Sequence, residues 1–85
     1  MKVSEFLKST RKAKGLSLRE VETLSGGLIS HPFLSQQESG HIKSPSLRGL
    51  YLHSKALGLD PAYIFQMAVN EIEAEIEAGN EPPTH

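Results

Sequence analysis

The sequence of 85 residues predicts an all-α fold, and three of its patterns lead to this fold class. Apolar side chains recur every three or four residues in successive segments, which is the spacing of one helix face. Serine or aspartate precedes these segments, as at the start of a helix, and glycine follows them, as at its end.

The chain has no cysteine, which excludes a disulfide framework and thiol chemistry.

The first predicted helix covers about residues 4–14. Its stripe at helical spacing is formed by Val3, Phe6, Leu7, Thr10 and Ala13. Gly15 stands where glycine commonly ends a helix, and Leu16 is placed to pack back on that helix.

The second predicted helix covers about residues 18–25. Ser17 and Glu20 form a capping box, because each side chain can bond to the backbone N–H of the other residue. Leu16 and Val21 flank the box as a hydrophobic staple. The pair Gly26-Gly27 then ends the helix in a tight turn.

The third predicted helix follows Ser30 and stops at Gly40. Pro32 falls in its first turn, where the missing N–H costs little. Its expected buried residues are Phe33, Leu34 and Gln37. Two short helices joined by a glycine turn are an arrangement that can place one helix end in a DNA groove.

The fourth predicted helix covers about residues 46–57 and ends at Gly58. Its expected inward residues are Leu47, Leu50, Tyr51, Ser54 and Leu57. Asp60 is a helix start with Pro61 at the first helical position, so a fifth helix is predicted from there.

The segment after residue 68 allows two interpretations. Phe65, Val69, Ile72 and Ile76 form one helix stripe, but the run EIEAEIEA also alternates as a strand does. Glutamate and alanine favour helix, so an acidic amphipathic helical extension is predicted over residues 69–78. Residues 79–85 are expected to be a flexible tail.

The charge is divided unevenly along the chain. Residues 1–69 contain all nine Lys and Arg with five acidic residues, a net charge of +4. Residues 70–85 contain five Glu and no Lys or Arg, a net charge of −5. A basic domain with an acidic tail suits a polyanionic partner, although small domains often carry such a charge without one.

The order and spacing of these features resemble the Cro/C1-type (XRE-family) helix-turn-helix domain. The resemblance covers about residues 3–68, and it is carried by Phe6, Leu7, Arg11, residues 15–21, Ile29, Ser30, residues 34–36, Glu38, Gly40, Pro45, Ser46, Leu50 and residues 56–59. It implies a five-helix, lambda-repressor-like bundle over residues 1–68, to which the C-terminal helical extension is added.

The resemblance also implies roles for single residues. Arg11 and Glu38 align with an internal ion pair that ties the first helix to the end of the third. The residues aligned with base contacts are His31, Pro32 and Gln36. The residues aligned with or suited to phosphate contacts are Ser17, Arg19, Ser30, Ser39, His41 and Lys43, with Lys14 as a further cation. Gln36 can bond bidentately to adenine, or accept and donate elsewhere in the major groove. His31 can donate to guanine or to a phosphate, and Pro32 suits a thymine methyl group.

Three departures from the family pattern bear on this site. The turn after the second helix is about two residues longer than usual. Glu22 replaces a small apolar residue, and the longer turn is expected to let it point outward. Gln37 stands where an aliphatic core residue is usual.

No catalytic residue, metal or cofactor is expected. The four histidines lack the spacing of a metal site, and the chain has neither a nucleophile motif nor a phosphate-binding glycine loop. Because no apolar run approaches ~20 residues, we expect no membrane span and a cytoplasmic protein.

The sequence therefore predicts a DNA-binding transcriptional regulator. A repressor is expected, acting on double-stranded DNA as a homodimer at a palindromic operator. The stripe of Phe65, Val69, Ile72 and Ile76 is expected to cover either the chain's own core or a second subunit. The alternative is a protein-interaction module or an antitoxin-like protein that uses the same scaffold and binds a partner through its acidic tail.

Overall fold

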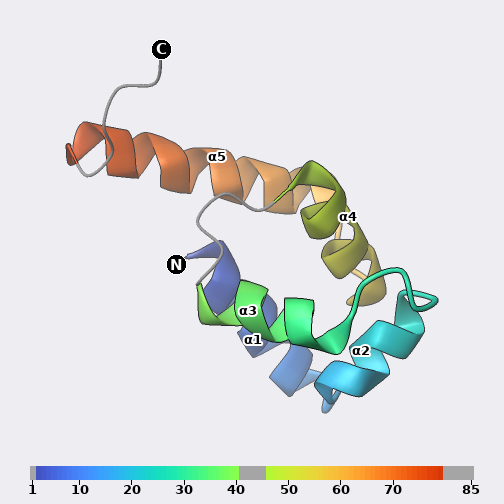
Figure 1. The fold of residues 1–85 in the computed structure, drawn as a ribbon. Coiled ribbons are helices and arrows are strands. Elements are labelled where there is room, and N and C mark those ends of the chain that lie inside the picture. Colours follow the sequence, from blue (N-terminus) through green and yellow to red (C-terminus); the bar gives the residue numbers. More distant parts are fainter. Residues whose placement is uncertain (1, 41–45, 80–85) are drawn as a thin grey trace.

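The computed structural model describes residues 2–40 and 46–79, and those residues form five helices and no strand. The helices are α1 (Val3–Ala13), α2 (Leu18–Leu24), α3 (His31–Ser39), α4 (Leu47–Ala56) and α5 (Pro61–Glu77). Figure 1 shows α1, α2 and α3 grouped on one side of the molecule and α4 leading to the long α5. The all-α prediction is confirmed, with helix ends within about two residues of their expected positions.

Local side-chain chemistry accounts for where the helices begin. Ser17 Oγ accepts the N–H of Glu20 at 3.1 Å, while Glu20 Oε1 accepts the N–H of Ser17 at 2.8 Å, as the capping box predicts. Ser46 Oγ accepts the N–H of Gly49 at 3.0 Å, and Asp60 Oδ1 accepts that of Ala62 at 3.0 Å. Each cap satisfies a backbone donor that a helix start leaves unpaired.

The core gathers one or two apolar side chains from every helix, one from the α2–α3 turn and one from the residue that follows α4. Its buried members are Val3, Leu7, Val21, Ile29, Leu34, Leu50, Leu57 and Ile64. The helices that pack on one another include α1 with α3, α2 with α3 and α4 with α5. This packing makes α2 and α3 one rigid unit with the rest of the bundle, which is the condition for a precise binding surface.

α4 is rotated relative to the sequence prediction. Leu47 and Tyr51 were expected inward, but their side chains are 69% and 46% exposed, whereas His53 is fully buried. The reason lies at Gly49, where a Cβ atom would stand only 3.0 Å from the Phe33 ring of α3. Because glycine leaves room for the Phe33 ring on this side, the inward face is centred on residues 49, 50, 53, 54 and 57.

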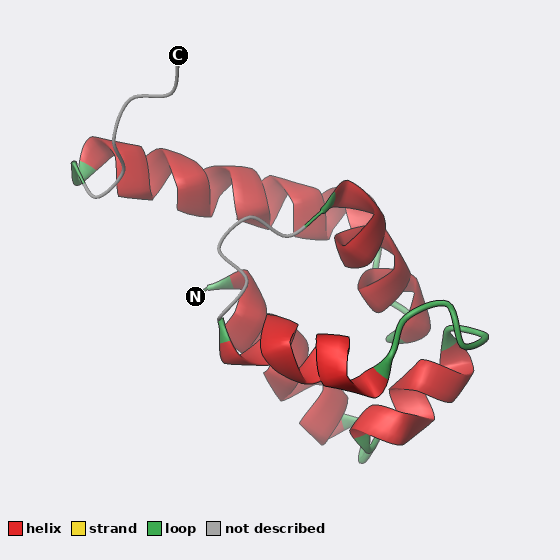
Figure 2. Ribbon diagram, viewed as in Figure 1, coloured by secondary structure: helices red, strands yellow, loops and turns green. Residues whose placement is uncertain are grey.

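α5 runs unbroken from Pro61 to Glu77, so the helical interpretation of the EIEAEIEA run is correct and the strand alternative is wrong. The second half of α5 extends beyond the other helices (Figure 2). Its side chains Val69, Ile72 and Ile76 are 47%, 47% and 57% exposed. The expected flexible tail lies almost entirely outside the described residues.

Candidate nucleic-acid interface

The α2–α3 turn is built around two neighbouring glycines. Residues 25–30 join the helices, and both Gly26 and Gly27 adopt left-handed conformations, with φ of 72° and 76°. Ser25 Oγ donates to the carbonyl of Glu22 at 2.6 Å and accepts the N–H of Ile29 at 3.2 Å. The turn is therefore held by its own hydrogen bonds and gives α3 a fixed starting point.

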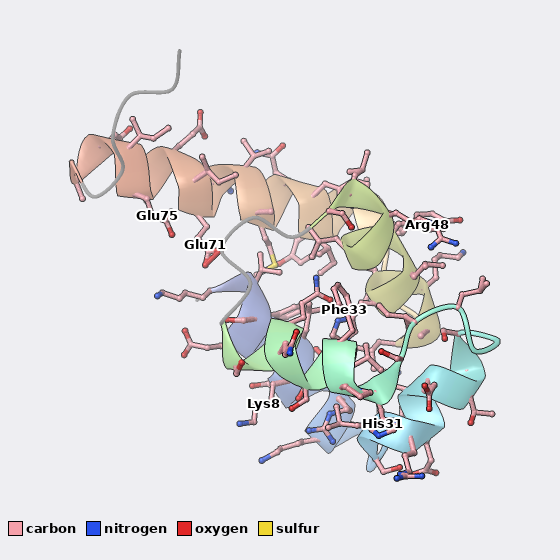
Figure 3. All side chains as sticks on the ribbon, in the orientation of Figure 1. Lys8, His31, Phe33, Arg48, Glu71 and Glu75 are labelled. Carbon is pink, nitrogen blue, oxygen red and sulfur yellow. The ribbon has the colours of Figure 1, made fainter. Side chains whose placement is uncertain are left out.

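Glu22 does not point outward as expected. Its Oε2 accepts the backbone N–H of His31 at 3.2 Å, and its Oε1 lies 3.2 Å from Nδ1 of the His31 ring. The hydrogen bonds from His31 hold the pKa of Glu22 below its usual value. This carboxylate therefore reaches across the turn to the start of α3 (Figure 3 labels His31 at that place).

The exposed surface of α3 carries the three residues expected to read bases. Pro32 and Gln36 are exposed and stand one helical turn apart, so they lie on the same face. His31 is about one-third exposed beside them. Gln36 has no side-chain hydrogen bond within residues 2–40 and 46–79, which leaves both ends of its amide available to a ligand.

The two helix starts differ in what they offer to a phosphate. In α3, the N–H groups of His31, Phe33 and Leu34 are taken by Glu22 Oε2, Ser30 Oγ and Ser30 O, and Pro32 has none. No backbone donor of this first turn remains for an anion, so the predicted Ser30 contact is restricted to its hydroxyl.

The start of α2 is more open. Among the described residues, the amides of residues 18 and 19 have no hydrogen-bond partner, and the side chain of Arg19 is exposed beside them. Ser17 Oγ accepts from Glu20 and keeps its own proton to donate. The Glu20 carboxylate accepts the N–H of Ser17 at this same helix start, so the Ser17 hydroxyl and the Arg19 guanidinium are the groups best suited to contact a phosphate here.

The remaining predicted phosphate contacts are less well defined. Ser39 Oγ donates to the Gln36 carbonyl at 2.8 Å, so its hydroxyl must rotate before it can donate to a phosphate. Lys14 is exposed just before the start of α2. His41 and Lys43 lie outside the described residues.

Arg11 and Glu38 lie together as the resemblance implied. Arg11 Nε donates to Glu38 Oε2 at 2.6 Å and Nη2 donates to Oε1 at 3.0 Å, which is a bidentate pair. Arg11 Nη1 also donates to the carbonyl of Leu16 at 2.7 Å. The hydrogen bond to Glu38 raises the pKa of Arg11. One guanidinium therefore joins α1, the loop before α2 and the end of α3.

Sequence reasoning missed a second polar contact under α3. Gln37 and His53 are both buried, and His53 Nδ1 lies 2.6 Å from Gln37 Oε1. Burial lowers the pKa of His53 to about 4, so the ring is neutral at pH 7. The available signal was the glutamine at a usually aliphatic position, which requires a polar partner inside the core.

Comparison with known families decides the identity. A family model described as helix-turn-helix matches residues 7–64, which is most of the chain. The chain belongs to the Cro/C1-type (XRE) helix-turn-helix family. This helix-turn-helix protein is accordingly a DNA-binding regulator. Comparisons with curated proteins and with solved structures give no significant match.

Two other kinds of site receive no support from the described part of this helix-turn-helix protein. No group of three His, Asp or Glu side chains there could hold a metal ion. None of its helices combines the length and the apolar character needed to cross a bilayer.

Proposed function

We propose that the protein is a repressor that binds a palindromic operator as a homodimer. In each subunit, the N-terminal part of α3 enters the major groove while α2 crosses the phosphate backbone. Repression follows from occupancy of the DNA, which blocks access of the polymerase. The observation that carries this proposal is the exposed face of α3, where Pro32 and Gln36 are free while Arg11 and Glu38 fix the other end of the helix.

Base reading falls mainly to Gln36. Its amide can accept from N6 and donate to N7 of one adenine, a bidentate contact that no other exposed α3 side chain provides. Pro32, one turn earlier, offers an apolar surface to a thymine methyl group. Phosphate contacts at the start of α2, through Ser17 and Arg19, set the register of α3 on the duplex without reading sequence.

The dimer is proposed to form through the second half of α5. Val69, Ile72 and Ile76 lie on one face of this helix and remain about half exposed. Phe65 belongs to the same stripe but packs partly on the core of its own chain, so it contributes less to the contact. Two copies that meet along this stripe would place two α3 helices at symmetric half-sites, as a palindrome requires.

The decisive experiment is selection of bound sequences from a random duplex pool at about 100 mM salt, with wild-type protein and Gln36→Ala in parallel. A two-fold symmetric motif that loses preference at one base position in the variant supports the proposal. Gln66→Ala is the matched control, because it removes the same side chain from the exposed surface of α5. Recovery of no motif would refute sequence-specific regulation.

The acidic half of α5 favours a second candidate, a protein-binding or antitoxin-like role. Glu73 and Glu77 are exposed and Glu71 and Glu75 are partly exposed, and this half of α5 carries no Lys or Arg, so a basic partner would complement it. The salt dependence of binding distinguishes the two candidate functions. Binding through several phosphates weakens roughly tenfold or more across moderate salt, and failure to bind duplex DNA in low salt would favour the protein partner.

A further inference from the structure

The Glu22–His31 contact determines which atom of the His31 ring is left to face a ligand. A carboxylate only accepts hydrogen bonds, and Glu22 Oε1 stands 3.2 Å from His31 Nδ1. The proton of the neutral ring is therefore held on Nδ1. Nε2 is then unprotonated and can only accept a hydrogen bond.

The backbone fixes the orientation of the Glu22 carboxylate. Its second oxygen accepts the N–H of His31, the first amide of α3, at 3.2 Å. Both oxygens are thus engaged by one residue, once through the backbone and once through the ring. The same carboxylate places a negative charge at the start of α3, which disfavours a phosphate there and leaves the His31 ring for a base edge.

We propose that Glu22 is a specificity-determining positioning residue, which holds His31 as the Nδ1–H tautomer so that Nε2 accepts a hydrogen bond from adenine N6 or cytosine N4. This inference rests on the proposed function, since it assigns a base preference to one position of the same interface. It reverses the sequence-based expectation for His31, which was donation to guanine or to a phosphate.

Glu22→Gln provides a sharp test because it keeps the size of the side chain. The backbone N–H of His31 requires the amide oxygen as its acceptor, so the amide NH₂ of the variant faces Nδ1 and donates to it. The ring proton then moves to Nε2, which becomes a donor. It then favours guanine, whose N7 and O6 both accept, over adenine, which pairs one acceptor with a donor, and over cytosine, which offers a donor. One substitution is therefore expected to reverse the tautomer and the base preference together.

The experiment has two readouts at pH 8, where imidazole side chains are ordinarily neutral. Nitrogen chemical shifts of the His31 ring report the tautomer in the free protein and require no DNA. Selection from a random duplex pool reports the base preference, and His31→Ala identifies the position that His31 contacts. Glu73→Gln on α5 is the control for the loss of one negative charge.

The expected result is Nδ1–H in the wild type, Nε2–H in Glu22→Gln, and a shift from adenine or cytosine to guanine by roughly tenfold at the His31 position. An unchanged tautomer overturns the inference whatever the DNA result. A reversed tautomer with an unchanged motif also overturns it but leaves the proposed function intact. If the wild type selects no motif, the proposed function fails and this assignment falls with it.

Discussion

His53 Nδ1 of α4 and Gln37 Oε1 of α3 meet at 2.6 Å inside the core. Both side chains are buried, and neither His53 Nε2 nor Gln37 Nε2 has a hydrogen-bond partner in the described structure. Burial lowers the pKa of His53 to about 4, while the charge of Glu38 acts to raise it and that of Arg11 to lower it. A proton on this ring is therefore poorly accommodated in the folded state.

The first prediction is that acid weakens the fold through His53. Its folded-state pKa of about 4 lies below the ordinary value of 6.5, so the unfolded chain binds the proton more readily. Stability is complete above about pH 6.5 and is lost as the pH falls towards 4. We expect urea unfolding to show a loss of about 2–3 kcal/mol between pH 7 and pH 4.5. If the free energy of unfolding of His53→Leu fell as steeply with pH, the loss would not come from His53.

The second prediction concerns the ion pair that ties α1 to α3. Arg11→Met leaves the buried carboxylate of Glu38 without its partner and the Leu16 carbonyl without its donor. We expect the free energy of unfolding to fall by about 3 kcal/mol, measured by urea denaturation at pH 7. Adding Glu38→Leu should recover part of that loss because no unpaired charge remains. A double variant no more stable than Arg11→Met would refute the explanation.

The sequence was informative wherever structure depends on neighbours in the chain. Ser17 and Glu20 are three residues apart, and their spacing alone predicted the start of α2 correctly. Glycines in left-handed conformations likewise follow α1 and end α3 at Gly15 and Gly40, as expected. These features need no knowledge of tertiary packing because their hydrogen bonds close within one turn.

Features that depend on how helices face one another could not be derived in this way. Glu22 meets His31 across the turn, and its direction depends on the path of that turn. The rotation of α4 depends on Gly49, because the absence of a side chain there leaves room for the Phe33 ring. Helix propensity identifies this glycine only as a weak helix former. In the candidate site, sequence pattern identified the surface of α3 but not the internal contacts that restrict its first residues.

The third prediction addresses the left-handed turn between α2 and α3. Gly27 has φ of 76°, a conformation that costs an L-residue roughly 1–2 kcal/mol. Nothing lies close to the position of an added Cβ atom, so Gly27→Ala isolates backbone strain from steric collision. We expect Tm to fall by about 4–8 °C or somewhat more in calorimetry. Ser9→Ala, on the exposed surface of α1, is the control. If the two variants have the same Tm, backbone strain at position 27 is not the cause.

The fourth prediction tests the proposed dimer through α5. Ile72 is half exposed in the isolated chain, and burying the remaining half against a second copy contributes about 0.8–1.5 kcal/mol in each of the two subunits. Ile72→Lys should therefore weaken self-association more than tenfold in sedimentation equilibrium and reduce binding to a two-fold operator towards that of a half-site. Ala74→Lys is the matched control, because it adds the same charge to the same helix away from the stripe.

Ala74→Lys also separates the effect of losing an apolar contact from the effect of adding a positive charge. Lysine in the acidic half of α5 reduces the repulsion between two copies, so Ala74→Lys should leave the dimer unchanged or strengthen it. Loss of the dimer in Ile72→Lys alone would establish the stripe as the interface. Equal behaviour of the two variants would place the dimer contact elsewhere, and a wild-type protein that remains monomeric on a two-fold operator would refute the proposed dimer.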